Sequence, residues 1–428
     1  MRRIRGIEAL RLGARRSFVL MGAGMALGLV MHSLAARRLG VVEYGVFTYA
    51  LNGATLGSLL LTLGWPTSAM RFVAQYREKE EWGLLRGLVT RSHQVVLVVS
   101  CVSALVVALV GRYALTSPSA RLSATLIALM LPAISLGLLR IRLLRGLLRV
   151  SDSIVAERLA IPLMVVVGLL VLPASSGAHV VLLWVAAALV LRAVETARLR
   201  SARPGGVADS ARAYRTGEWG RVAIGIALGE VARATLARGD TMMLGAMSGM
   251  QDVAVYGAAR RVGMLITFTL NAVNAIAGPL LASAYHGGRS AEFRRVLRKS
   301  ALWSMLGALP AFTWVMVAPE SVLWLFGPEF RGHGSLVRVV ALGQFANAAT
   351  GPVVMALLMT GRQRRYSLSV VVVAVANLAA NAFIIPMWGL YGAAWIAAGC
   401  TASLNCWLFV QARRAAPAEA APEAAGKA

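Results

Sequence analysis

Long apolar runs alternate with short polar or charged segments along almost the whole chain. Each run has about the 17–25 residues that an α-helix needs to cross the hydrocarbon core of a bilayer. The pattern predicts an all-α polytopic membrane protein with about 12 transmembrane helices. The expected spans lie at 17–36, 46–64, 94–115, 122–139, 157–173, 178–197, 222–247, 253–281, 300–317, 335–358, 366–386 and 390–410.

The two halves of the sequence carry related motifs. A glycine, an acidic residue and a Tyr-Gly pair occur at 40–45 and again at 249–257, and a proline follows each copy at a matching distance. Another match relates 144–149 to 359–364, and the copies are again half the chain length apart. Chance similarity between apolar helices is the alternative explanation. The Tyr-Gly motif, the proline after it and this second motif match at nearly the same offset, which favours an internal duplication instead.

The duplication predicts two six-helix lobes. Because six is an even number, both lobes enter the membrane in the same direction. They are then related by a pseudo-twofold axis along the membrane normal, with a substrate path between them. We expect an N-terminal lobe at 1–199, a cytoplasmic linker at 200–221 and a C-terminal lobe at 222–414. The Ala/Pro/Glu-rich tail at 415–428 has the composition of a disordered segment.

The net charge of +26 stands out on a chain with only 14% charged residues and 58% hydrophobic ones. A soluble domain carries about 25% charged residues. With the N-terminus inside, 34 of the 44 Lys and Arg residues fall on predicted cytoplasmic segments, and five fall on the opposite side. The positive-inside rule therefore predicts cytoplasmic N- and C-termini. The charge is explained by orientation and contact with anionic lipid, without a nucleic-acid partner.

The remaining five arginines lie inside or at the edges of predicted spans, where a charge costs about 2.5–3.5 kcal/mol on insertion scales. The seventh span concentrates such charges, with Glu230, Arg233, Arg238 and Asp240. At about 100° per residue, all of these except Arg238 lie within about 80° of one another on the helix. Two interpretations stay open. Glu230 and Arg233, three residues apart, either neutralise each other or form part of a polar wall that faces a cavity.

The other intramembrane candidates lie further along the chain. Arg260, Arg261 and Arg338 either snorkel toward outer head groups or form a cationic path along the cavity. Asn274 is one of several asparagines in the later spans. Such amides bond either to substrate hydroxyls or to neighbouring helices.

In the first half, His32 near the outer end of the first span is expected to be a buried packing residue. Glu43-Tyr44-Gly45 has a counterpart in both halves. A structural turn is therefore a better explanation for this motif than substrate contact.

Several kinds of chemistry are not expected. Cys101, Cys400 and Cys406 lie in apolar runs without ligand-type spacing, so neither a metal site nor a cofactor is predicted. None of the three lysines follows a glycine-rich phosphate loop, so no Walker-type ATPase is predicted. Transport would then be passive or coupled to H⁺ or Na⁺. Glu230 and Asp240 are the candidate ion-coupling carboxylates.

A set of short motifs occurs in a characteristic order from about residue 15 to residue 410, nearly the whole chain. These motifs are Leu39-Gly40 with Glu43-Tyr44-Gly45, Arg71-Phe72-Val73-Ala74, Asp240 with Leu244-Gly245, Tyr256-Gly257-Ala258-Ala259-Arg260-Arg261, Ala277-Gly278-Pro279-Leu280, Leu325-Phe326-Gly327-Pro328-Glu329-Phe330, Leu342-Gly343-Gln344, Gly351-Pro352 and Met359-Thr360-Gly361. Through them the chain resembles a Wzx-like polysaccharide biosynthesis flippase, a lipid-linked oligosaccharide translocase of the multidrug/oligosaccharidyl-lipid/polysaccharide exporter superfamily.

The resemblance implies two lobes around a central cavity and alternating access. The implied cargo is an oligosaccharide on polyprenyl pyrophosphate, moved from the cytoplasmic to the periplasmic leaflet for surface polysaccharide biosynthesis. Glycan polymerase and glycosyltransferases are the implied partners, besides membrane lipids. The Ala/Arg-rich, Lys-poor composition fits a GC-rich bacterial genome, and the resemblance implies a location in the bacterial inner membrane. The expected cavity residues for pyrophosphate and glycan are Arg233, Arg238, Arg260, Arg261, Arg338 and Asn274.

Two other classes of function compete with a flippase. A multidrug antiporter of the toxin-extrusion type exports cations and should place acidic groups in its cavity. Here the predicted spans contain five arginines but only two clear carboxylates. An integral-membrane enzyme needs convergent catalytic groups, commonly on a large external loop. The predicted outward segments are short and hold no His/Asp/Glu cluster, so we do not expect an enzyme.

Overall fold

The computed structural model describes residues 2–173, 175–202 and 204–415, with side chains from residue 16 onward. All regular elements of this described part are helical, which confirms the all-α class. The tail predicted to be disordered, 415–428, lies outside the described residues except for Ala415. Contacts between Cα atoms divide the chain into two compact units, 1–255 and 256–428.

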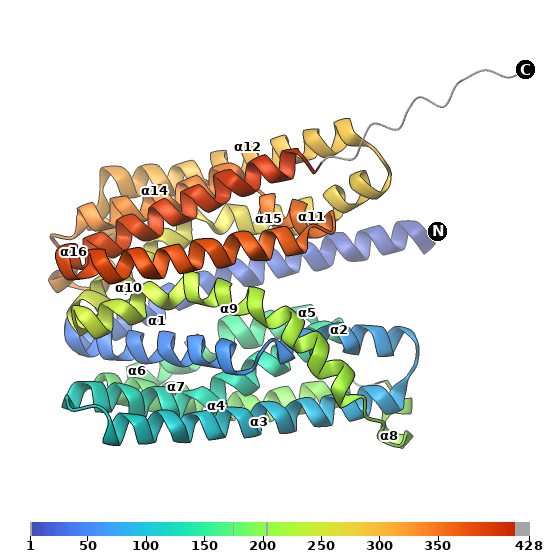
Figure 1. Cartoon of the computed structure of the whole chain (residues 1–428), viewed down its shortest axis with the longest axis horizontal. Helices are drawn as coiled ribbons and strands as arrows, with labels where there is room; N and C mark the ends of the chain where they lie inside the picture. Colours follow the sequence, from blue (N-terminus) through green and yellow to red (C-terminus); the bar gives the residue numbers. More distant parts are fainter. Residues whose placement is uncertain (1, 174, 203, 416–428) are drawn as a thin grey trace, which may run out of the picture. The chain divides into compact units, whose positions relative to one another are not determined.

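The first unit holds the elements up to the start of α10 (Figure 1). Its helices α3, α4 and α7 pack in sequence, α3 on α4 and α4 on α7, and α9 packs on α1 and α2. The elements are α1 (Arg2–Leu61), α2 (Trp65–Glu78), α3 (Trp82–Tyr113), α4 (Pro118–Gly146), α5 (Val150–Ile154), the π-helix η1 (Val155–Ala160), α6 (Ile161–Val171), α7 (Gly177–Ser201), α8 (Gly206–Asp209), α9 (Thr216–Met247) and the first residues of α10 (Met250–Ile266).

The second unit begins within α10 and is again a helical bundle. In it α12 packs between α11 and α14, and α14 packs on α16. Its further elements are α11 (Phe268–His286), α12 (Ser290–Val317), α13 (Pro319–Leu323), the 3₁₀ turns η2 (Trp324–Phe326) and η3 (Pro328–Phe330), α14 (Gly334–Thr350), α15 (Val353–Met359) and α16 (Gln363–Arg413).

The boundary between the units falls inside α10, whereas the sequence predicts a linker at 200–221. The difference arises because α9, the expected seventh span, packs on α1 and α2 and so belongs to the first unit by contacts. The division into two lobes at 200–221 stays a prediction.

Helix α1 is a hairpin of two antiparallel helices. Gly40 interrupts it with φ 74° and ψ 174°, a conformation that glycine adopts without steric cost. The rings of His32 and Phe47 are 5.8 Å apart, although 15 residues of straight helix would separate them by about 22 Å. The reversal at Gly40 therefore lies between the first and second expected spans.

Helix α16 reverses in the same way at Gly389, which has φ 53° and ψ −136°. Trp407 Nε1 donates a hydrogen bond of 3.2 Å to Ser369 Oγ across the two halves. The eleventh and twelfth expected spans are thus the two arms of one hairpin.

Not every expected span is equally apolar. Seven helices of the described chain are long and apolar enough to cross a membrane, and nine are if two bent pairs count as single spans. The bent pairs are α10 with α11, at 45°, and α14 with α15, at 42°. Helix α9 does not reach this hydropathy because it carries several charges. The count of twelve spans stays a prediction.

One end of the first unit has its own apolar core around Trp219, which is fully buried. Trp219 Nε1 donates a hydrogen bond of 2.8 Å to Tyr76 Oη. Burial raises the pKa of Tyr76, which keeps this phenol neutral. The core ties α2, α3 and the end of α4 to the start of α9, and so fixes one end of the charged helix described next.

Candidate functional site

The charged residues of α9 include one ion pair on its surface. Arg233 Nη2 donates to Glu230 Oε2 at 2.6 Å, and the two side chains are 49% and 16% exposed. The residues are three apart, so each reaches the other from adjacent turns. The pair that the sequence left as one of two alternatives is therefore formed, while much of the guanidinium remains accessible.

A second helix adds cationic groups to this region. Arg142 of α4 is half-buried and lies within electrostatic range of Glu230, Arg233, Arg145 and Glu157. Arg145 forms an ion pair with Glu157 and also donates to Ser153 Oγ at 3.1 Å. We call the charged residues of this group the α4–α9 cluster: Arg142, Arg145, Glu157, Glu230 and Arg233. Three guanidiniums against two carboxylates leave it one positive charge in excess.

Arg142 and Arg145 belong to the segment 140–158, which the charge distribution predicts to be cytoplasmic, and nothing in the sequence joins them to Arg233. Their spacing of three residues puts both on one side of α4. That signal shows only that the two arginines are neighbours. Helices α4 and α9 both pack on α2, and this shared neighbour brings Arg142 within electrostatic range of Glu230 and Arg233.

The other charged candidates of the first unit are deeper. Asp240 is fully buried, and its Oδ1 accepts a hydrogen bond of 2.7 Å from the Thr241 backbone N–H. Arg238, two residues earlier, is half-buried. The expected role of Asp240 as an ion-coupling group stays a prediction.

The remaining sequence candidates lie in the second unit. Arg260 stacks over the Tyr256 ring at 5.7 Å from its centroid, and Arg261 is half-buried beside it. Arg338 is exposed, and its Nε donates to the Met316 carbonyl at 3.0 Å. This bond lies within the last turn of α12, where unpaired carbonyls favour a cation.

Asn274 on α11 carries a buried acceptor. Its Oδ1 has no hydrogen-bond partner among the described residues. A buried, unsatisfied amide oxygen is costly unless another group supplies a donor. This atom is therefore free to accept from a hydroxyl.

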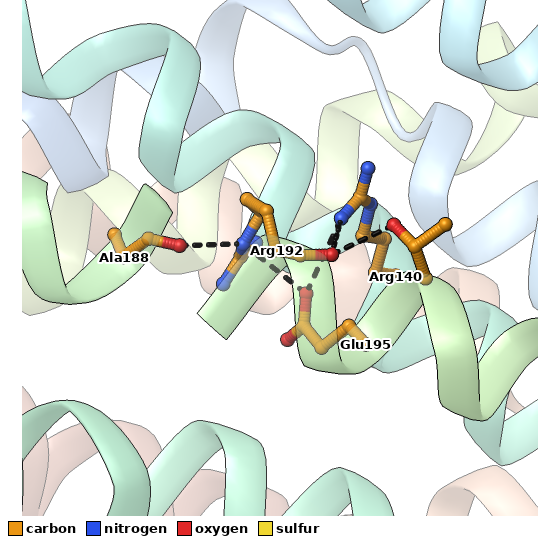
Figure 2. A network of polar contacts seen from close by, with 5 residues as sticks. Arg140, Ala188, Arg192 and Glu195 are labelled. Carbon is orange, nitrogen blue, oxygen red and sulfur yellow. Dashed lines mark hydrogen bonds and ion pairs between the residues drawn. The ribbon is translucent and has the colours of Figure 1, made fainter. Parts of the chain in front are cut away.

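A second ionic network lies between α4 and α7, and none of its residues was a candidate from the sequence. Figure 2 shows Arg140 and Arg192 converging on Glu195. Arg192 Nε lies 3.1 Å from Glu195 Oε2, and Arg140 Nη1 lies 4.0 Å from the same oxygen. The side chains of Glu195, Arg192 and Arg140 are only 2%, 11% and 14% exposed. We call these three residues the α4–α7 network.

Backbone carbonyls hold both guanidiniums of the α4–α7 network. Arg140 Nη1 donates to the Arg192 carbonyl at 2.6 Å, and Arg192 Nε donates to the Ala188 carbonyl at 3.1 Å (Figure 2). A Cβ on Gly137 would lie 2.5 Å from Arg192 Nη1, so glycine leaves room for the guanidinium. Access to the network is closed, which suits helix packing better than ligand exchange.

The duplicated motif near the N-terminus makes structural contacts. Glu43 Oε2 accepts a 2.7 Å hydrogen bond from the Gly177 N–H at the start of α7. The buried Tyr44 hydroxyl lies 3.2 Å from Nδ1 of the buried His32. A Cβ on Gly45 would lie 1.9 Å from the Met250 carbonyl oxygen. The expected structural role of this motif and of His32 agrees with these contacts.

No group of three or more His, Cys, Asp or Glu residues suited to a metal ion occurs in the described part of the chain. Its three cysteines are free. The functional candidates are therefore arginines, carboxylates and amides.

Comparisons with known proteins identify a family and a shared fold. The family model of polysaccharide biosynthesis proteins matches residues 14–284. No curated protein matches the sequence. The fold is similar to that of a multidrug resistance MATE family transporter of the MOP superfamily in an inward-facing conformation, at 15% identity, a TM-score of 0.69 and 93% coverage of both chains.

Two further solved structures share this fold. One is the lipid II flippase MurJ in an inward closed conformation, at 12% identity and a TM-score of 0.71, covering 92% of this chain and 86% of that one. The other is a MOP superfamily transporter from Pyrococcus furiosus, at 14% identity, a TM-score of 0.56 and 94% coverage of both chains. The chain therefore has the fold of MOP superfamily membrane transporters.

Proposed function

Because the chain belongs to the polysaccharide biosynthesis protein family, we propose that it is a flippase for a polyprenyl-pyrophosphate-linked oligosaccharide. The cargo would move from the cytoplasmic to the periplasmic leaflet of a bacterial inner membrane by alternating access. The family match over residues 14–284 is the observation that carries the proposal. The transporter fold supports it, because this fold also occurs in a lipid II flippase.

The α4–α9 cluster is our candidate for the pyrophosphate group. Arginine binds phosphate oxygens through two parallel N–H donors, and such contacts strengthen where water is scarce. The Arg233 side chain is 49% exposed, more than that of Arg145 at 30%, and Glu230 orients its guanidinium at 2.6 Å. Arg142 and Arg145 add positive charge from α4, which packs on α2 as α9 does.

The other predicted cavity residues are assigned as follows. Arg238, Arg260 and Arg261 would extend a cationic path, and Asn274 would accept from a glycan hydroxyl through its unsatisfied Oδ1. Arg338 is the weakest of these candidates because its Nε bonds to a backbone carbonyl. Glu230 and Asp240 would carry H⁺ or Na⁺ if transport is ion-coupled.

Reconstitution tests the proposal directly. Proteoliposomes containing a fluorescent lipid-linked oligosaccharide in the outer leaflet should lose accessible label faster than empty liposomes. An imposed H⁺ or Na⁺ gradient should change the rate if Glu230 or Asp240 couples transport. Equal rates with and without the protein would overturn the proposal.

A multidrug antiporter is the second candidate, and the fold of MATE transporters favours it. Such an exporter moves cations, whereas the α4–α9 cluster has an excess of positive charge. Gradient-driven efflux of a cationic dye from the same proteoliposomes, without movement of the lipid-linked oligosaccharide, would establish the antiporter instead.

A further inference from the structure

The connection between α12 and α14 forms an open cavity within the second unit. Its volume is about 620 Å³, which falls in the range of small-molecule binding sites. The cavity is lined by Glu320, Ser321, Trp324, Arg331 and Gly332. These residues lie on the side of the membrane that the charge distribution predicts to be outside.

The wall of this cavity is a folded segment. Helix α13 and the turns η2 and η3 place four apolar side chains in the core of the second unit. Val322, Leu323 and Phe326 are completely buried, and Phe330 is almost completely buried. Anchors of this size at short intervals hold the segment in one conformation, so its polar side chains have defined positions.

Hydrogen bonds fix the polar side of the cavity. Glu320 accepts from the Gly334 N–H through Oε1 at 2.9 Å and from the Gly332 N–H through Oε2 at 3.1 Å. Its carboxylate thus compensates the N-terminus of α14. Ser321 Oγ accepts from Trp314 Nε1 at 3.0 Å.

Two groups on this frame face outward. Trp324 is 50% exposed although its neighbours Leu323 and Phe326 are buried. The exposed Arg331 guanidinium makes no hydrogen bond or ion pair with any described residue. The cavity therefore presents an aromatic ring beside an arginine without a described partner, while both carboxylate oxygens of Glu320 already accept from backbone N–H groups.

We propose that this cavity binds a glycan segment that contains acidic sugars. The apolar face of a sugar ring would pack on Trp324, and a sugar carboxylate would accept two hydrogen bonds from Arg331. A site on the outer side would engage the oligosaccharide after translocation. The choice of a glycan as ligand rests on the proposed function, but the cavity and the exposure of Trp324 and Arg331 do not depend on it.

The competing explanation is an interfacial anchor, because tryptophan and arginine are also common where proteins meet lipid head groups. The experiment uses the full chain in nanodiscs and separates these cases by the surroundings of Trp324. Its fluorescence is obtained as the difference between wild type and Trp324→Phe. Acrylamide, a neutral quencher in water, should quench this signal, and brominated lipid should not. Trp303, an exposed residue on α12, serves as the control that brominated lipid should quench.

Binding is then measured as protection of Trp324 from acrylamide by free oligosaccharides. A hyaluronan hexasaccharide should protect it, and Arg331→Gln should weaken the apparent Kd by roughly tenfold or more. Arg121→Gln, at another exposed arginine on the predicted outer side, should leave the Kd unchanged. Quenching by brominated lipid, absence of protection by the hexasaccharide, or equal protection by neutral maltohexaose would each overturn the inference. The assay contains no lipid carrier and no transport step, so its failure is distinct from failure of flipping.

Discussion

The first unit contains two groups of charges that look alike in the sequence and differ in the fold. Each combines arginines of α4 with charged residues of a later helix at a spacing of three, Arg192 with Glu195 and Glu230 with Arg233. In the α4–α7 network the carboxylate is 2% exposed, whereas in the α4–α9 cluster Arg233 is 49% exposed. The comparison teaches that burial decides whether such an ionic group joins helices or stays available to a ligand.

The largest expected effect is that of Glu195→Ala. It leaves two guanidiniums close together without their carboxylate, and breaking a buried ion pair costs about 3–5 kcal/mol. The thermal stability of the detergent-purified protein should fall strongly, as measured by fluorescence-detected size exclusion after heating. A stability equal to that of wild type would remove the structural role of the α4–α7 network.

Replacing two members together sharpens this result. The double variant Arg192→Met/Glu195→Met removes one positive and one negative charge together and keeps side chains of similar volume. Buried ion pairs replaced by apolar residues often show neutral or even improved stability. We expect the double variant to be more stable than Glu195→Ala, which removes less. If it is less stable, specific hydrogen bonds of the Arg192 guanidinium matter more than charge balance.

A smaller effect on stability is expected for Arg142→Gln in the α4–α9 cluster. Arg142 is half-buried, and the glutamine keeps polar contact while removing the charge. Flipping should slow because the pyrophosphate loses one cation, and thermal stability should change much less than in Glu195→Ala. Arg364→Gln, at an exposed arginine of the second unit that is not among the expected cavity residues, is the matched control, and it should leave flipping and stability unchanged.

The smallest effect on stability is expected for Arg233→Ala. An exposed ion pair contributes at most about 1 kcal/mol. Its effect on transport should nevertheless be large, with flipping reduced roughly tenfold or more because charge-assisted hydrogen bonds contribute about 1.5–3 kcal/mol. Arg233→Lys should recover part of the rate, since lysine keeps the charge without the two-pronged geometry. Unchanged flipping in Arg233→Ala would assign the pair to helix packing alone.

Much of the fold follows from local features of the sequence. The apolar runs predict membrane helices, and Gly40 between two such runs lies where α1 reverses. The structural contacts of Glu43, Tyr44 and Gly45 also match the interpretation of a repeated motif as a turn. These features depend on residues that are near one another in the chain, so the sequence contains them.

The α4–α7 network could not be recognised in this way. Arg140 and Glu195 are separated in the chain by α5, η1 and α6, and both lie at the ends of apolar runs, where charges normally meet water. Packing of α4 on α7 removes that water. A contact of the expected linker at 200–221 could not be recognised from the sequence either. Its Ala213 N–H donates a hydrogen bond of 3.1 Å to the Gly83 carbonyl. Nothing in its polar composition predicts that contact.

The sequence by itself therefore determined that this protein is a helical membrane protein, and its motifs indicated the polysaccharide biosynthesis family. It also indicated that intramembrane charges are concentrated in the seventh expected span, which is α9. Only the tertiary structure decided which arginines are buried with a carboxylate, which remain accessible, and that Trp324 and Arg331 share one cavity. The physical reason is that hydropathy and helical periodicity act over neighbouring residues. Desolvation of a charge depends on helices that are distant in sequence and meet only when the chain folds.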